Sequence, residues 1–155
     1  MITRIAVMIV CLGLVLGLCA GTPASAGTTY HNPAMPGPED ALYWLDQGGL
    51  FATYGNFPAA ARAYMKALEL DPQNSEGYFD LGLALAELGR LDESLAQIEK
   101  ALALNPREAR YYYGRGRVQL LGGHTQEALA DFSKAAAMGH PDALTFLAMS
   151  KRASI

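Results

Sequence analysis

The stretch SEGYFDLGLALAELGRLDESLAQIEKALALNPRE (75–108) decides the fold, because two helical patterns follow one another in it. The first half carries one face of small and apolar residues at helical spacing: Tyr78, Leu81, Gly82 and Leu85. After Gly89-Arg90 a second apolar face follows: Leu91, Leu95, Ile98, Ala101 and Leu102. Asn105-Pro106 ends it, since proline lacks the amide hydrogen and disfavours helix at the preceding residue. The stretch therefore predicts a helical hairpin.

The same pattern returns every 34 residues on both sides of this stretch. One column is aromatic and three are small: Trp44, Tyr78, Tyr112 and Phe146; Gly48, Gly82 and Gly116; Gly55, Gly89 and Gly123; Ala67, Ala101 and Ala135. The period delimits copies at 41–74, 75–108 and 109–142. We expect the small columns at close helix contacts and the aromatic residues between neighbouring hairpins. Such repetition predicts stacked hairpins rather than a closed globule around one buried active site.

These residues resemble the signature of the tetratricopeptide repeat (TPR). The first copy matches it at Trp44, Gly48, Phe51, Gly55, Phe57, Ala60, Tyr64, Ala67 and Pro72. The second matches at Tyr78, Leu81, Gly82, Leu85, Gly89, Ile98, Ala101 and Pro106, and the third at Tyr112, Gly116, Gly123, Ala128, Phe132 and Ala135. Departures are Gln47 and Arg115 for a usual leucine, Ser94 for a usual alanine, and a third copy ending Gly139-His140-Pro141. The resemblance implies an all-α, right-handed superhelix of three stacked hairpins, with a capping helix and tail at 143–155.

The resemblance also implies a concave groove that binds a peptide or protein segment along the first helix of each hairpin. Carried over residue by residue, its lining is Leu42, Leu45, Glu76, Phe79, Leu83, Arg110, Tyr113, Arg117 and Leu120. Arg110, Tyr113 and Arg117 share one helix face, and two guanidinium groups there suit an acidic group. The alternative is that both arginines are solvated and pair with nearby carboxylates: Glu76, Asp80 and Glu108.

The residues at the groove positions narrow the chemistry of the expected ligand. Some TPR proteins bind the C-terminal carboxylate of chaperones, but only Arg110 fits that residue set among the matching positions Leu45, Gly49, Asp80, Arg110 and Gly114. The other end of the predicted groove is apolar, at Leu42, Leu45, Phe79 and Leu83. We therefore expect a partner with a hydrophobic anchor at one end and an acidic group at the other. The lead segment or a second copy of the chain could also fill the groove.

The first 26 residues have the composition of a secretory signal. Arg4 precedes an uncharged apolar run from Ile5 to Leu18, and Ala24-Ser25-Ala26 forms a cleavage site before Gly27. The alternatives are an uncleaved membrane anchor and a lipid on Cys19, although Leu18 stands where lipoprotein signals need a small residue. Both cysteines, Cys11 and Cys19, lie within this segment. We predict a periplasmic or secreted product with a flexible Pro/Gly-containing lead at 27–40.

Nothing in the sequence indicates an enzyme. The net charge of −3 gives no basic patch for nucleic acid, and His31, His124 and His140 lack metal-ligand spacing. The glycines follow the repeat rather than a phosphate-binding motif. We predict a non-enzymatic interaction module, without metal, cofactor or small-molecule substrate, that binds a protein or peptide segment and contacts a membrane only if the signal is uncleaved. The alternative is a self-associating structural module of a cell-envelope assembly.

Overall fold

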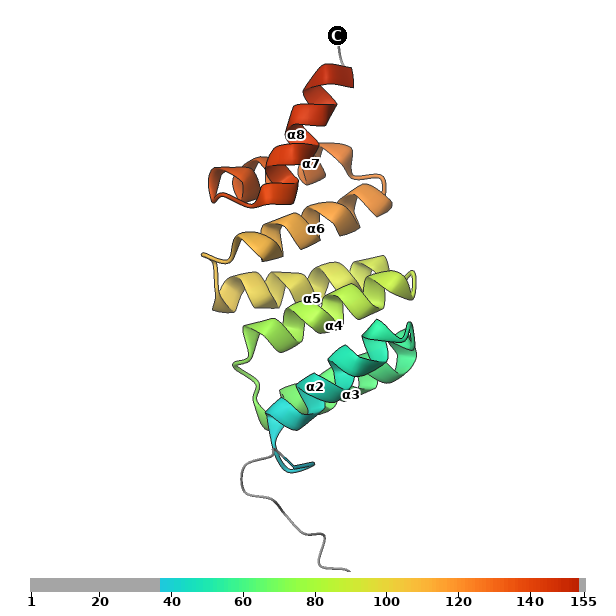
Figure 1. The fold of residues 1–155 in the computed structure, drawn as a ribbon. Coiled ribbons are helices and arrows are strands. Elements are labelled where there is room, and N and C mark those ends of the chain that lie inside the picture. Colours follow the sequence, from blue (N-terminus) through green and yellow to red (C-terminus); the bar gives the residue numbers. More distant parts are fainter. Residues whose placement is uncertain (1–36, 154–155) are drawn as a thin grey trace, which may run out of the picture. The chain divides into compact units, whose positions relative to one another are not determined.

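The computed structural model describes residues 37–153, which form seven helices and no strand in that range. The helices are α2 (Ala41–Thr53), α3 (Phe57–Leu70), α4 (Ser75–Glu87), α5 (Leu91–Leu104), α6 (Ala109–Leu121), α7 (Thr125–Ala137) and α8 (Pro141–Ala153) (Figure 1). The predicted signal, its cleavage site, both cysteines and most of the predicted lead lie outside the described residues. Within them, every helix is too short or too polar to cross a membrane.

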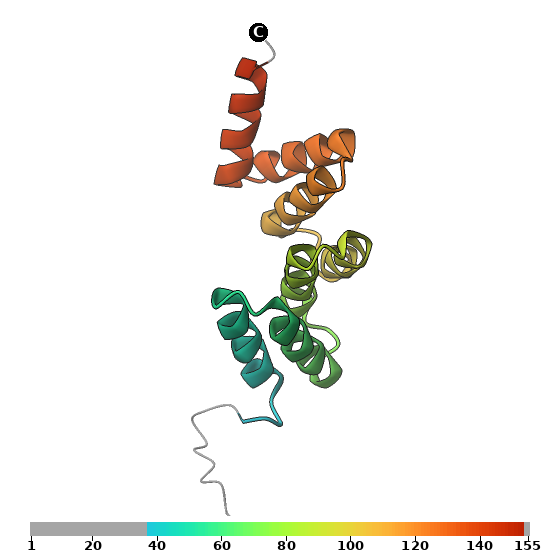
Figure 2. The same cartoon turned by 90° about the vertical axis from the view of Figure 1, so that its right-hand side faces the viewer.

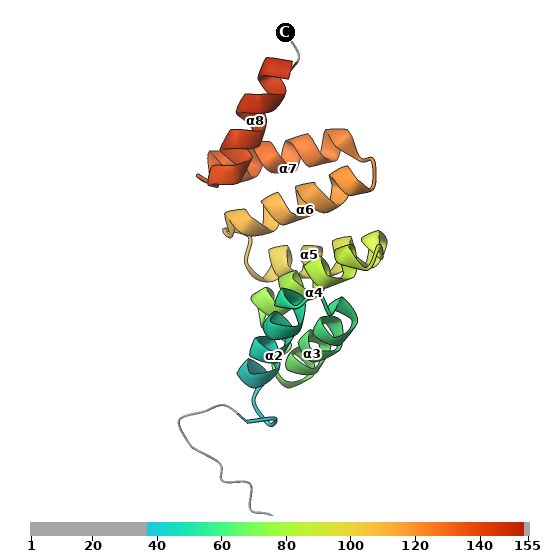
Figure 3. The same ribbon diagram turned by 45° about the vertical axis from the view of Figure 1, so that its right-hand side comes forward.

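The helices pair as predicted. The most extensive contacts join α2 to α3, α4 to α5 and α6 to α7, and smaller contacts join each pair to the next. Figures 2 and 3 show these hairpins following one another in chain order, with α8 as a single helix after α7. Two core clusters fill the stack, one mainly between α3 and α4 and one reaching from α4 to α7 and Ala143. The all-α solenoid of stacked hairpins is therefore confirmed.

The glycine columns serve two different purposes, which corrects the expectation that all of them allow close packing. A Cβ at Gly48, Gly82 or Gly116 would lie 2.4, 2.6 or 2.9 Å from a side-chain atom of the second helix in the same hairpin. A Cβ at Gly55, Gly89 or Gly123 would meet nothing within 4 Å. These three have φ of 72°, 75° and 82°, a left-handed conformation that only glycine adopts readily. They end the first helix of each hairpin.

The last hairpin ends differently from the first two, which moves the start of the terminal helix. The helices α3 and α5 end at Leu70 and Leu104, and their C-cap residues, Asp71 and Asn105, are each followed by proline. In contrast, α7 ends through Gly139, whose φ is 87°. Pro141 then begins α8, two residues before the expected 143, because proline fits the first turn of a helix.

The aromatic column also changes environment along the chain. Tyr112 is buried, and its hydroxyl donates to the backbone oxygen of Pro106. Tyr78 packs against both core clusters, as expected for a residue between hairpins. Trp44 is only partly buried, and its indole N–H donates to the Pro38 oxygen at 2.7 Å. The first member of the column therefore holds the segment before α2, because no hairpin precedes it in the described chain.

Candidate functional site: a groove along the first helices

The first helices of the hairpins line a series of hollows, which we call the groove. One hollow of about 500 Å³ lies between α2 and α4, and its walls are Leu42, Leu45, Asp46, Gly49, Leu50, Thr53, Glu76 and Asp80. A second of about 300 Å³ lies between α4, α6 and the start of α8, with walls of Phe79, Asp80, Leu83, Arg110, Tyr113, Gly114, Arg117, His140 and Asp142. A smaller hollow of about 210 Å³ contains Ala52, Phe57, Tyr64, Asp80, Leu83, Ala84 and Glu87. Asp80 borders all three.

The structure distributes the predicted groove residues over the two larger hollows. Leu42, Leu45 and Glu76 line the hollow between α2 and α4. The hollow at α6 collects Phe79, Leu83, Arg110, Tyr113 and Arg117. Leu120, with 40% of its surface exposed, lines none of the hollows described above.

Phe79 differs from its expected role as an accessible anchor. Only 3% of its surface is exposed. Its ring packs at 4.7 Å from the Tyr111 ring, and the Arg110 guanidinium lies 5.1 Å from its centroid. A Cβ at Gly114 would lie 2.4 Å from the same ring. Phe79 therefore forms the floor of the hollow, and the partly exposed Leu83 is the aliphatic side chain that a ligand can reach.

The two arginines have different electrostatic environments. Arg110 pairs with Glu76, with 3.1 Å between Nη2 and Oε1, so the interpretation of a carboxylate-paired arginine holds for this contact. Within the described residues, Arg117 forms no hydrogen bond through its side chain and no ion pair. Beside it, the His140 ring stacks on Tyr113 at 4.4 Å. Arg117 is therefore the cation in this hollow whose charge is open to a ligand.

Asp80 is a functional candidate that the sequence did not reveal, since it was considered only as an arginine partner and as a position that does not fit the chaperone-binding residue set. Burial, together with the negative charge of Glu76, raises the pKa of Asp80 to about 6, although Arg110 opposes the shift. Its own burial, together with the same two carboxylates, raises the pKa of Tyr64 to about 12. The helical spacing of Glu76 and Asp80, one turn apart on α4, is the signal that could have indicated a shared acidic face.

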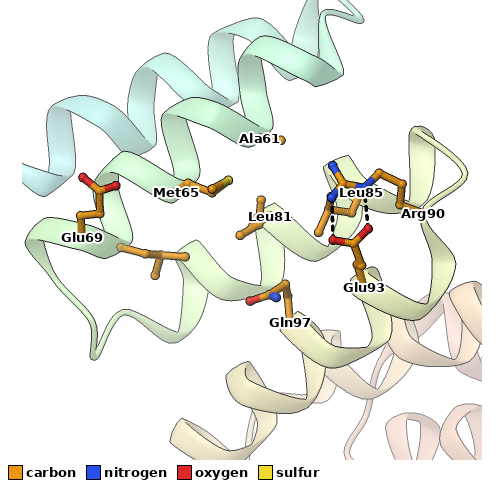
Figure 4. A pocket seen from close by; sticks show the side chains of 9 residues that line it. Ala61, Met65, Glu69, Leu81, Leu85, Arg90, Glu93 and Gln97 are labelled. Carbon is orange, nitrogen blue, oxygen red and sulfur yellow. Dashed lines mark hydrogen bonds and ion pairs between the residues drawn. The ribbon is translucent and has the colours of Figure 1, made fainter.

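A separate hollow of about 370 Å³ lies between α3, α4 and α5 (Figure 4). Its apolar lining is Ala61, Met65, Leu68, Leu81 and Leu85, and its polar lining is Glu69, Arg90, Glu93 and Gln97. Arg90 and Glu93 pair with each other, with 2.7 Å between Nε and Oε1. Their charges are thus compensated within the hollow.

Residues 37–153 contain no group of three His, Cys, Asp or Glu side chains that could hold a metal ion. The groove instead combines exposed leucines, carboxylates and two arginines, which are groups that bind peptides by apolar contact and charge.

Comparison with known protein families agrees with the repeat architecture. A family profile described as "Tetratricopeptide repeat" matches residues 79–143, and one described as "TPR repeat" matches residues 50–89. The chain belongs to the tetratricopeptide repeat family. A search of curated proteins found no match to this TPR protein.

Solved TPR structures share the fold. The first TPR of Spaghetti (RPAP3) bound to the HSP90 peptide SRMEEVD is 21% identical, with a TM-score of 0.68 over 76% of this chain and 94% of that chain. The Arabidopsis OM64 TPR domain is 20% identical, with a TM-score of 0.69 over 76% and 98%. The TPR2B domain of yeast Sti1 in complex with pHsp70 is 26% identical, with a TM-score of 0.62 over 63% and 78%.

Proposed function

We propose that this TPR protein is a non-enzymatic adaptor whose groove binds a segment of another protein. The observation that carries the proposal is that Arg117, beside Leu83 and Tyr113 in the hollow at α6, has no ion-pair partner in the part of the chain that the structure describes. A guanidinium with free donors binds a carboxylate strongly, and the neighbouring side chains offer apolar contact. Two of the similar TPR structures hold peptide or protein ligands derived from HSP90 and Hsp70.

The bound segment places an acidic group at Arg117, within reach of Arg110, and an apolar side chain over Leu83 and the Phe79 ring. Arg110 contributes less than Arg117 to the binding of the acidic group, because its ion pair with Glu76 already neutralises part of its charge. A chaperone-type C-terminal carboxylate is not the expected ligand. At the matching positions, Leu45, Gly49 and Gly114 have no side-chain donor, and Asp80 is acidic.

We further propose that the adaptor works outside the cytoplasm. The support is the sequence alone: Arg4, the apolar run 5–18 and Ala24-Ser25-Ala26. Mass spectrometry of the protein from its native host should find an N-terminus at Gly27 in the periplasmic or secreted fraction. A chain that retains Met1 and sediments with membranes would contradict cleavage and support an anchor.

Affinity capture from the envelope fraction tests the adaptor function. The wild-type protein should retain a partner that Arg117→Ala loses, while Arg62→Ala, at an exposed arginine on α3, should retain it. Native mass spectrometry should find a monomer without the partner. A stable homo-oligomer whose assembly depends on Arg117 would instead show that a second copy closes the groove.

A further inference from the structure

We propose that the segment bound in the groove also carries a cationic side chain, lysine or arginine, which is held between α2 and α4. The proposal rests on the proposed function and adds the direction in which the segment lies. Its basic residue would sit at the α2–α4 hollow and its acidic group at Arg117.

The α2–α4 hollow has acidic and aliphatic walls. Its titratable side chains are Asp46, Glu76 and Asp80, and none of its lining residues is Lys, Arg or His. Leu42 and Leu50 border the same hollow with 53% and 48% of their surfaces exposed. A lysine or arginine matches both walls, because its methylene stem packs on apolar surface while its charged end stays with polar groups.

The carboxylates of this hollow outnumber the cationic side chains that pair with them. Glu76 has Arg110 as its ion-pair partner, whereas Asp46 and Asp80 form no side-chain hydrogen bond or ion pair within the described residues. Asp80 is half-buried, and its raised pKa reflects the lost hydration and the nearby Glu76. A ligand cation would supply the missing counter-charge, as opposite charges close together favour the ionised carboxyl.

The balance of charge changes along the groove. The α2–α4 hollow has three carboxylates and no cationic side chain in its lining, whereas the α6 hollow has Arg110 and Arg117 beside Asp80 and Asp142. A segment with one basic and one acidic residue therefore fits in one direction, while the reversed segment would bring like charges together. Like charges placed face to face oppose binding, so this arrangement selects direction as well as partner.

A nuclear magnetic resonance titration with small probes tests the cation site independently of the natural partner. The probes are N-acetyl-Leu-Arg-amide and, as matched controls, N-acetyl-Leu-Gln-amide and N-acetyl-Leu-Glu-amide. The arginine probe should saturably shift signals of Leu42, Leu45 and Asp80, and the neutral and acidic probes should bind there at least five-fold more weakly. Equal binding of the arginine and glutamine probes, or no shifts in this hollow, would overturn the proposal.

Charge-neutral variants localise the effect. Asp80→Asn and the more exposed Asp46→Asn should each weaken the arginine probe at least three-fold. Asp92→Asn changes the net charge equally at an exposed site on α5 and should leave the probe unaffected. An equal loss in Asp92→Asn would mean attraction by net charge alone and would refute a specific site. If Arg117-dependent capture succeeds but the arginine probe does not bind, the adaptor function is supported and the cation site is refuted.

Discussion

Arg110 on α6 and Glu76 on α4 occupy the same position in successive hairpins, 34 residues apart, and their side chains form an ion pair across the groove. Both side chains are well exposed, at 44% and 58%. Exposed pairs of this kind contribute about 0 to 1 kcal/mol to stability. The pair matters more for binding than for stability. It neutralises part of the charge of Arg110, whereas the charge of the neighbouring Arg117 stays available to a ligand.

Arg117→Ala should weaken partner binding by about 1.5 to 3 kcal/mol, the range for a lost charge-assisted hydrogen bond. The free energy of unfolding should change by less than about 1 kcal/mol, as for other exposed charges. Arg110→Ala should weaken binding less. Calorimetric titration and thermal melting of both variants measure the two effects. A variant that binds normally but melts much earlier would show that its arginine is structural.

Asp80→Asn should stabilise the protein at pH 7 by about 1 to 3 kcal/mol, since a pKa raised from 3.8 to about 6 makes ionisation unfavourable in the folded state. The stabilising effect of a protonated Asp80 is complete below pH 3.8 and is lost as the pH rises through about 6. The advantage of the asparagine should therefore shrink from pH 7 towards pH 4. Thermal melts across this range measure it, with Asp92→Asn as control; a pH-independent difference would contradict the assigned cause.

Gly116→Leu should destabilise the protein by about 1 to 3 kcal/mol through overpacking. A Cβ at Gly116 would lie 2.9 Å from Phe132 Cε1 and 3.1 Å from the backbone oxygen of Ala128. The matched control is Gly49→Leu, because Gly49 is also helical but has nothing within 4 Å of its Cβ position. Chemical denaturation should show Gly49→Leu neutral or stabilising, since leucine favours helix more than glycine does. Equal losses in both variants would refute the packing explanation.

Gly89→Ala should destabilise the protein by about 1 kcal/mol although the added methyl group meets no atom, because its φ is 75°. Gly89→Asn should lose less, as asparagine tolerates the left-handed region better. Denaturation curves for the two variants decide the matter. If alanine were tolerated fully, the turn would have to relax into another conformation.

Arg115 and Asp131 form a two-point ion pair between α6 and α7, at 2.7 and 2.8 Å, with side-chain exposures of 24% and 8%. These hydrogen bonds raise the pKa of Arg115 above its ordinary value. Asp131→Ala should destabilise by about 1 to 3 kcal/mol, because it leaves a partly buried charge without its partner. The double variant Arg115→Leu/Asp131→Gln copies Leu81 and Gln97 of the preceding hairpin and should recover most of the loss in thermal melts. A double variant as unstable as the single one would contradict this account.

Arg115 illustrates which features the sequence could predict and which it could not. The residue was visible as an arginine where the repeat usually has leucine, but its partner Asp131 lies on the next helix. The same holds at the groove. Both arginines were predicted to line it, but the sequence did not distinguish Arg110, which pairs with Glu76, from Arg117, which forms no ion pair among residues 37–153. Spacing within one helix predicts a shared face but gives no information on the charges of neighbouring helices.

The sequence by itself determined the helices, their pairing and the order of the hairpins. These depend on residues within one helical turn of each other and on local stop signals such as Asn105-Pro106. Only the tertiary structure decided that Phe79 is a buried floor, that Asp80 borders all three hollows of the groove and that Arg117 has no ion-pair partner among residues 37–153. The physical reason is that burial and ion pairing depend on side chains from different hairpins, which meet only after the hairpins stack.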